Sequence, residues 1–295
     1  MIRQQYETPG VVFLRVSNKA GPVDVHAHDG ETTEVEVTVN GDAGAEAVAY
    51  TKIEHVETES GHRVLIEVPA RSGVLRPWVK RGTTVRVAVR LPEGASVQIE
   101  TAAGEVSAEG RLGHASVQTA SGDVSVERTD GDLRVRTASG DIVVGSVSGS
   151  ARIQTASGDV RGGTIEGGGE IKTASGDVRV EATGGGLMVQ TASGDVSTGH
   201  LAAGCLVKTA SGDLHVGRLT GGRAELETVT GDIDVAVARG AVVAVDAVTV
   251  SGSLSSEIDL DAEAPDLTGE DDIARLELHA RTVSGDLRIE RAALA

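Results

Sequence analysis

The sequence repeats one short motif at a fixed interval of 18 residues. Thr-Ala-Ser-Gly-Asp occurs six times in succession, beginning at positions 119, 137, 155, 173, 191 and 209, and a looser copy, Thr-Ala-Ala-Gly-Glu, begins at Thr101. This period is too short for the common helical repeats, which need more than ~30 residues, and suits one coil of a β-solenoid, whose strands stack about 4.8 Å apart. The sequence therefore predicts an all-β fold, a parallel β-solenoid (β-helix or β-roll-like) with 18-residue coils.

Alternation within each repeat assigns the two faces of the predicted strands. Two aliphatic columns are expected to face inward, at 124, 142, 160, 178, 196 and 214 and at 135, 153, 171, 189 and 207. A polar column beside the second one alternates cations with amides, at Arg136, Gln154, Lys172, Gln190 and Lys208. Because stacked cations repel one another, the interposed glutamines indicate that these coils stack in register.

Composition divides the chain near residue 95. All four aromatic residues lie in the first 78 positions, and every proline except Pro265 precedes residue 95. We expect residues 1–95 to form an N-terminal β-sheet cap continuous with the solenoid, because solenoids need an atypical end segment that blocks edge pairing. Residues 96–295 are expected to form the solenoid repeats, with an acidic insertion at 257–272 that holds eight acidic residues and no basic ones.

The motif places one aspartate in every coil, and these aspartates form a predicted ladder. Its members are Asp123, Asp141, Asp159, Asp177, Asp195 and Asp213. One interpretation is that each carboxylate accepts backbone N–H bonds within its own Ser-Gly turn, with glycine supplying a positive φ and threonine filling the corner. The alternative is a calcium ladder similar to that of the parallel β-roll, although here glycine directly precedes aspartate and the double glycine of that motif is missing.

A local reversal of charge between Pro69 and Pro92 is the candidate partner-binding segment. It holds six basic residues, no acidic ones and the only tryptophan. The alternative interpretation is a loop with solvated charges whose tryptophan packs on the cap. The residues proposed to contact a partner are Arg71, Arg76, Trp78, Lys80 and Arg81.

Charge and motif patterns exclude several other classes of function. The formal net charge of −17 argues against general binding to nucleic acid or an anionic membrane. The eight histidines lack metal-type spacing except His26 and His28, which allow a weak site. The glycine triplets at 167–169 and 184–186 do not open a helix and are interpreted as turns. Cys205 falls in an inward column, which predicts a buried, inert thiol.

No targeting signal is evident in the sequence. The first residues lack a basic segment followed by an apolar one, and no stretch approaches ~18 consecutive apolar residues. The single cysteine is compatible with a reducing compartment. These features favour a cytoplasmic protein without a membrane span.

The Thr-Ala-Ser-Gly-Asp repeats, with the variants Thr-Val-Thr-Gly-Asp at Thr228 and Thr-Val-Ser-Gly-Asp at Thr282, resemble a bacterial family of β-strand-repeat domains. Members of this family have no known function and are often labelled candidate adhesins. The resemblance covers nearly the whole chain and implies a solenoid of short strands with no established catalytic residues. It also implies a connection to the cell envelope or surface.

Three functions are compatible with these observations. The first is a non-catalytic scaffold that binds a macromolecule, protein or glycan, without a cofactor. The second is a polysaccharide-active β-helix enzyme, which would need carboxylates placed across a groove. The third is a calcium-binding β-roll-like protein. We expect the first, because the regular repeat singles out no catalytic constellation; the oligomeric state stays open.

Overall fold

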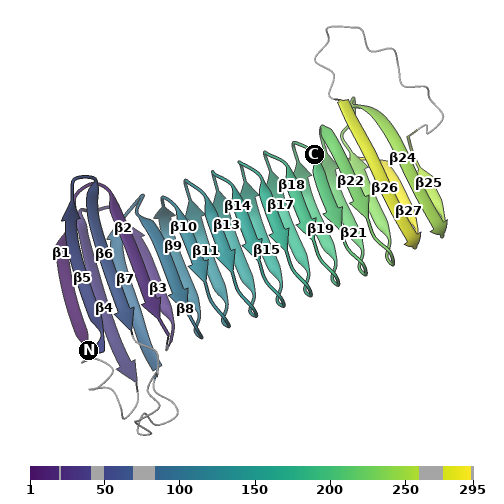
Figure 1. The fold of residues 1–295 in the computed structure, drawn as a ribbon. Coiled ribbons are helices and arrows are strands. Elements are labelled where there is room, and N and C mark those ends of the chain that lie inside the picture. Colours follow the sequence, from purple (N-terminus) through teal and green to yellow (C-terminus); the bar gives the residue numbers. More distant parts are fainter. Residues whose placement is uncertain (20, 41–49, 69–83, 259–274, 294–295) are drawn as a thin grey trace, which may run out of the picture. The chain divides into compact units, whose positions relative to one another are not determined.

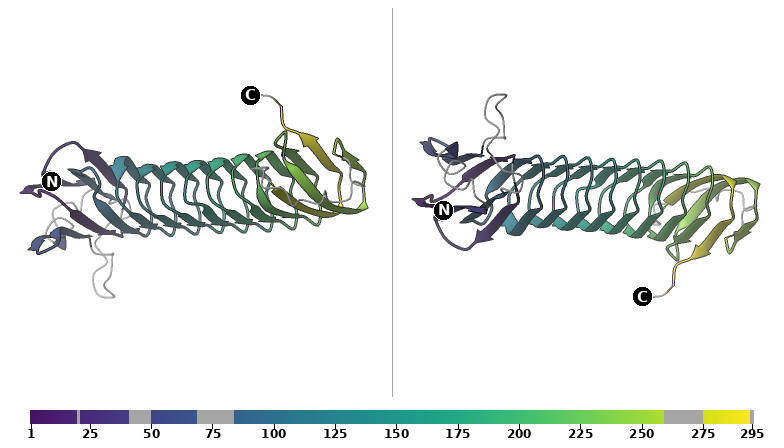
Figure 2. Two further views of the ribbon diagram at one scale, coloured as in Figure 1. Left: turned by 90° about the horizontal axis from the view of Figure 1, so that it is seen from above. Right: turned by 90° about the horizontal axis from the view of Figure 1, so that it is seen from below.

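The computed structural model describes residues 1–19, 21–40, 50–68, 84–258 and 275–293. It separates into two compact units, residues 1–149 and 150–295. The elements with described bounds are all β-strands, and each unit consists of two facing sheets (Figures 1 and 2). The predicted all-β parallel solenoid is confirmed. The division near residue 95 stays a prediction.

Unit 1 is a mixed sheet pair that becomes parallel along the chain. Its strands are β1 (Ile2–Glu7), β2 (Val12–Asn18), β3 (Val23–His28), β4 (Thr32–Asn40), β5 (Lys52–Thr58), β6 (Gly61–Val68), β7 (Thr84–Pro92), β8 (Ser96–Thr101), β9 (Val106–Leu112), β10 (Ala115–Gln118), β11 (Val124–Thr129), β12 (Leu133–Arg136) and β13 (Ile142–Val147). The first sheet has the order β1-β4-β7-β3-β9-β11-β13, and the second has the order β12-β10-β8-β2-β6-β5. The pairs β1/β4, β4/β7 and β5/β6 are antiparallel, and β2 and β3 join parallel neighbours.

Unit 2 contains the remaining strands, and every described pair in it is parallel. They are β14 (Ala151–Gln154), β15 (Val160–Ile165), β16 (Gly169–Lys172), β17 (Val178–Thr183), β18 (Leu187–Gln190), β19 (Val196–Leu201), β20 (Cys205–Lys208), β21 (Leu214–Leu219), β22 (Gly222–Glu227), β23 (Ile233–Val237), β24 (Val242–Ser251), β25 (Leu254–Ser256), β26 (Arg275–Ser284) and β27 (Leu287–Arg291). One sheet has the order β15-β17-β19-β21-β23-β27-β25, and the facing sheet has the order β24-β26-β22-β20-β18-β16-β14.

The two halves of a coil differ, although their sequences look alike. In one sheet the strands have six residues, as in Val178–Thr183, and in the other they have four, as in Leu187–Gln190. Along the longer strand the pairing passes from Val180 to Ala182 in β17 and from Thr198 to His200 in β19, so each strand skips one residue and the alternation of side chains shifts in both. Thr183 is therefore buried, like Val178 and Val180.

The predicted inward columns form the core of both units. Their members are at most 2 % exposed, from Val124 and Val135 in unit 1 to Leu214 and Val207 in unit 2. A third buried column lies after this shift in the alternation and includes Leu112, Val147, Ile165, Leu201 and Leu219. Valine, isoleucine, leucine and alanine thus make up the buried hydrophobic residues of these columns, as expected for side chains that pack between facing sheets.

The last coils do not stack in sequence order. Thr282 comes after Thr228 and Thr249 in the sequence, but it pairs with Thr249 and lies between it and the coil of Thr228. The strand order β22-β26-β24 shows that residues 242–256 form the outermost coil. The 16 residues between Ile258 and Arg275 supply the chain length that such a return requires.

Candidate functional site

The aspartate ladder is a chain of hydrogen bonds between successive coils. The Oδ1 atom of Asp177 accepts the backbone N–H of Asp195 at 2.9 Å, and Asp195 accepts that of Asp213 at 2.8 Å. The expectation that each carboxylate bonds within its own turn was wrong for these bonds, because parallel stacking places the next coil's N–H directly beside the carboxylate. The bonds of this kind run from Asp123 to Asp141, Asp159 to Asp177, Asp213 to Asp232, Asp232 to Asp286 and Asp286 to Ser253.

Glycine and threonine complete each turn as expected. Gly176 has a φ of 126°, and a Cβ atom there would collide with the carbonyl oxygen of Gly158 in the preceding coil. The Thr173 hydroxyl donates to the carbonyl oxygen of Ser175 at 3.0 Å, and the threonine side chain is buried. The motif therefore allows successive coils to stack closely, and this close approach requires glycine at its fourth position.

The calcium interpretation of the ladder stays a prediction. One oxygen of each bonded aspartate already accepts an N–H group, and the described residues contain no group of three or more His, Cys, Asp or Glu side chains that could hold a metal ion. The pKa of Asp286 is held below its usual value because its carboxylate accepts the backbone N–H of Ser253. In the structure the ladder carboxylates act as hydrogen-bond acceptors for backbone N–H groups.

The sequence-predicted partner segment lies outside the described residues. This applies to Arg71, Arg76, Trp78, Lys80 and Arg81, and to residues 259–272 of the acidic insertion. His26 and His28 have separate partners: His26 Nδ1 lies 3.3 Å from Glu109 Oε2, and His28 Nε2 lies 3.1 Å from the carbonyl oxygen of Thr32. Cys205 is buried, and desolvation raises the pKa of its thiol to about 12.

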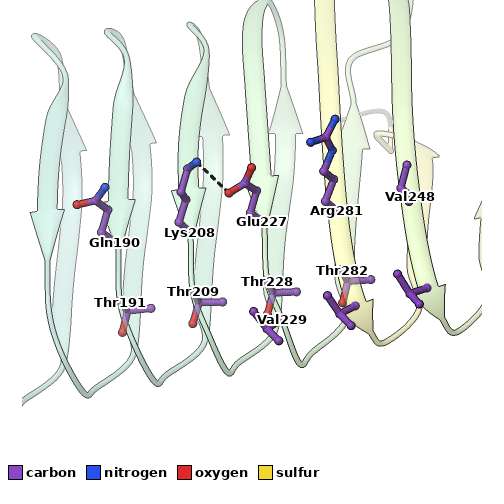
Figure 3. A pocket seen from close by; sticks show the side chains of 12 residues that line it. Gln190, Thr191, Lys208, Thr209, Glu227, Thr228, Val229, Val248, Arg281 and Thr282 are labelled. Carbon is purple, nitrogen blue, oxygen red and sulfur yellow. Dashed lines mark ion pairs between the residues drawn. The ribbon is translucent and has the colours of Figure 1, made fainter.

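The described surface has a shallow groove in unit 2, where the repeat motif changes. Alanine follows threonine in the six regular copies, but valine does so at 229, 250 and 283. These valines are 52 %, 76 % and 48 % exposed, and Val248 beside them is 46 % exposed. The groove encloses about 560 Å³ (Figure 3). Its lining residues are Gln190, Thr191, Lys208, Thr209, Glu227, Thr228, Val229, Val248, Val250, Arg281, Thr282 and Val283.

The charged side chains that line this groove are paired (Figure 3). Lys208 Nζ lies 2.8 Å from Glu227 Oε2 and 3.0 Å from Glu225 Oε1, and the hydrogen bond to Glu227 is the main reason that its pKa is raised. Arg281 contacts Asp246 at 3.3 Å, and hydrogen bonding from His279 and then Arg281 lowers the pKa of that aspartate. The groove thus combines exposed aliphatic side chains with charges that already have partners.

A second shallow groove lies on the same sheet. Met188 and Leu206 occupy outward positions, which are polar in the neighbouring strands, and both are half-buried. Gly186 and Gly204 line the adjoining turn, and a Cβ atom at Gly204 would collide with the backbone carbonyl oxygen of Arg223. This groove encloses about 470 Å³, and Glu170 lies at one side of it with Lys172 at 2.9 Å. The outward face of the sheet from β16 to β24, which we call the grooved face, therefore has two apolar depressions.

Comparison with protein families identifies the chain. The family model described as Toastrack DUF4097 matches residues 14–217 and 186–290. The chain belongs to the Toastrack family. The stacked strands and repeated Gly-Asp turns described above are thus the Toastrack architecture of this chain.

Several solved structures are similar to this Toastrack chain at low identity. One is a candidate cell adhesion protein from Clostridium sporogenes, with 10 % identity, a TM-score of 0.27, and coverage of 98 % of this chain and 99 % of that one. Two are candidate adhesins from Bacteroides fragilis and Parabacteroides distasonis, each with 12 % identity and coverage of 98 % of this chain and 96 % of that one; their TM-scores are 0.39 and 0.36. No curated protein matches the chain.

The grooved face of the Toastrack chain was missed by sequence reasoning. Its signal is the change from Thr-Ala to Thr-Val in the last motif copies, which sequence reasoning treated as a looser form of the repeat. Within the part of the chain that the structure describes, no helix is long and apolar enough to cross a membrane.

Proposed function

We propose that this Toastrack protein is a non-catalytic scaffold that binds a macromolecular partner on the grooved face. The observation that carries the proposal is the row of exposed valines at 229, 283 and 250, which replaces the alanines of the regular coils. Exposed aliphatic side chains gathered along a groove are typical of interaction sites, because their burial gains about 1 kcal/mol for each half-exposed valine.

The chemistry of the groove favours a polypeptide over a glycan. Sugar-binding surfaces depend on aromatic rings, and the sequence has no aromatic residue after Trp78. The paired charges of Lys208 and Arg281 leave little uncompensated charge for an ionic ligand. An extended peptide with small aliphatic side chains can fill the depressions and accept or donate hydrogen bonds at Gln190.

The polysaccharide-active alternative receives less support from the ladder. Its carboxylates follow one another along the turns, one in each coil, and accept N–H bonds from the next coil. Glycoside hydrolysis needs two carboxyl groups on opposite sides of the scissile bond. The non-catalytic proposal is therefore preferred.

The experiment is a paired screen with a random 12-residue peptide library and a glycan array. The Val229→Lys and Val283→Lys variants test the groove, and Val143→Lys, a change at an exposed valine in unit 1, is the matched control. We expect aliphatic peptides to bind the unchanged protein and the control, and to lose at least ~10-fold in affinity to the groove variants. Binding that the groove variants leave unchanged, or turnover of any glycan, would contradict the proposal.

A further inference from the structure

The strand β24 is a ten-residue edge, whereas β25, the edge strand of the facing sheet in unit 2, has only three residues. Strand β24 pairs in parallel with β26 over nine residue pairs, and among the described residues no strand pairs with its other side. Ten residues in extended conformation therefore present one side of their backbone groups without a strand partner in the described chain. Such an edge is a template for the addition of another strand.

The composition of β24 lacks the features that normally prevent pairing. It contains five valines, two alanines and a single charged residue, Asp246, with neither lysine nor proline. The edge strands of unit 1 are different: β1 carries Arg3 and Glu7, and β5 carries Lys52, Glu54 and Glu57. Charges of this kind are the usual protection of an edge. Protection is thus present on the edges of unit 1 and absent from β24.

The hydrophobic interior also reaches this edge. Val243, Val245 and Ala247 are in register with Leu276, Leu278 and Ala280 of β26, whose side chains are at most 1 % exposed. The three residues of β24 themselves are only half-buried. A further strand paired with β24 would bury these three side chains more fully, just as β24 covers the side chains of β26.

We propose that β24 is a self-association strand, which pairs in antiparallel orientation with β24 of a second copy of this chain. The inward residues of β24 all have odd numbers, so in an antiparallel pair of two copies they face one another only when the numbers of opposite residues add up to an even sum. A pair centred on Val245 meets this condition and sets Val243 opposite Ala247 and Asp246 opposite Ala244. A pair centred on Asp246 would instead set two carboxylates against each other.

The association has to overcome the acidity of the chain, which carries a net charge of −17. Residues 239–258 and 275–291 contain five basic and five acidic side chains, but the intervening residues 259–274 add seven acidic residues and no basic ones. Asp246 itself is paired with Arg281 at 3.3 Å and with His279 at 3.2 Å. The remaining repulsion between two acidic chains is long-range, so salt screens it. The self-association therefore strengthens or persists as ionic strength rises.

The experiment is sedimentation velocity of the full chain over a range of concentrations, at low salt and at about 0.5 M salt. We expect a monomer–dimer equilibrium that Val245→Lys weakens at least ~10-fold, because pairing would bury the new charge. Val248→Lys changes an exposed outward position in the same strand, so it does not threaten folding. We expect this variant to weaken the dimer as well. Val143→Lys is the matched control and is expected to dimerise like the unchanged protein.

Cysteine scanning fixes the orientation. Single cysteines at 244, 245 and 246 are oxidised in turn, and the buried Cys205 does not compete. In a two-fold antiparallel pair only the central residue faces its own copy, so Val245→Cys is expected to give the covalent dimer. A monomer at every concentration, a dimer that Val245→Lys and Val248→Lys leave unchanged, or a dimer lost at high salt would overturn the proposal. Because these assays need no ligand, their failure is distinct from failure of the proposed binding function.

Discussion

The carboxylate of Asp177 accepts the backbone N–H of Asp195, the equivalent residue of the next coil, at 2.9 Å. This bond joins coils rather than closing one turn. The same relationship links Asp159 to Asp177 at 3.0 Å, so Asp177 is both an acceptor through its side chain and a donor through its backbone. The ladder therefore adds a side-chain bond at each turn to the backbone pairing of the sheets.

Removal of one ladder carboxylate tests this role. Asp177→Ala is expected to lower the free energy of unfolding by about 1 kcal/mol, because the N–H of Asp195 loses its acceptor. Asp177→Asn keeps an oxygen acceptor and is expected to cost less than half as much. Glu181→Ala, at an exposed acidic residue of the next strand, is the control and should change the stability by under ~0.5 kcal/mol. Urea unfolding measures all three; equal effects of Asp177→Ala and Glu181→Ala would exclude the ladder bond.

Two glycines offer a matched comparison of backbone requirements. Gly176→Ala is expected to destabilise the protein by roughly 2 kcal/mol or more, because its φ is 126° and the new methyl group meets the carbonyl oxygen of Gly158. Gly162 is also buried, but the nearest atom to an added Cβ is Val180 Cγ2 at 3.7 Å, and its φ is not in the left-handed region. Gly162→Ala is expected to be neutral or to stabilise by about 0.4–1 kcal/mol. Thermal unfolding of both variants provides the measurement, and similar losses in the two would refute the turn argument.

Calcium removal is expected to leave the protein unchanged. The ladder carboxylates already accept N–H bonds, whereas a ligand that binds only the folded state would raise the melting temperature further as its concentration exceeds its Kd. We therefore expect melting curves in calcium and in chelator to agree within about 1 °C. A larger calcium-dependent rise, accompanied by metal in the isolated protein, would restore the β-roll interpretation.

Cys205 predicts a pH dependence in the alkaline range. Burial raises the pKa of its thiol from 9.0 to about 12, so the folded state holds the proton more tightly than the unfolded chain. The unfolded state binds fewer protons between these two values, and stability from this residue therefore falls as pH rises from about 9 toward 12. Cys205→Ala removes this dependence at a cost of about 1 kcal/mol for the lost sulfur. Urea unfolding at pH 8 and pH 10 should show a smaller decrease for the variant; parallel decreases would contradict the prediction.

The repeat determined most of the fold by itself. A period of 18 residues with inward aliphatic positions can be satisfied only if equivalent side chains stack, so Val124, Val178 and Leu214 could be assigned to the core from the sequence. The positive φ at the motif glycine was also predicted from the same pattern, because glycine has no Cβ atom and adopts this conformation readily in turns. Such inferences succeed where the requirement is local or is repeated in every coil.

Tertiary structure alone decided the features that depend on a neighbouring coil. The acceptor role of Asp177 toward Asp195 spans 18 residues, and the order that places Thr282 between Thr228 and Thr249 reverses the order of the chain. Exposure of Val229 and the open side of β24 likewise depend on which coil lies last. A local sequence pattern predicts on which face of its strand a residue lies. The partners of that residue depend on how the strands stack, and the stacking order is set only in the folded chain.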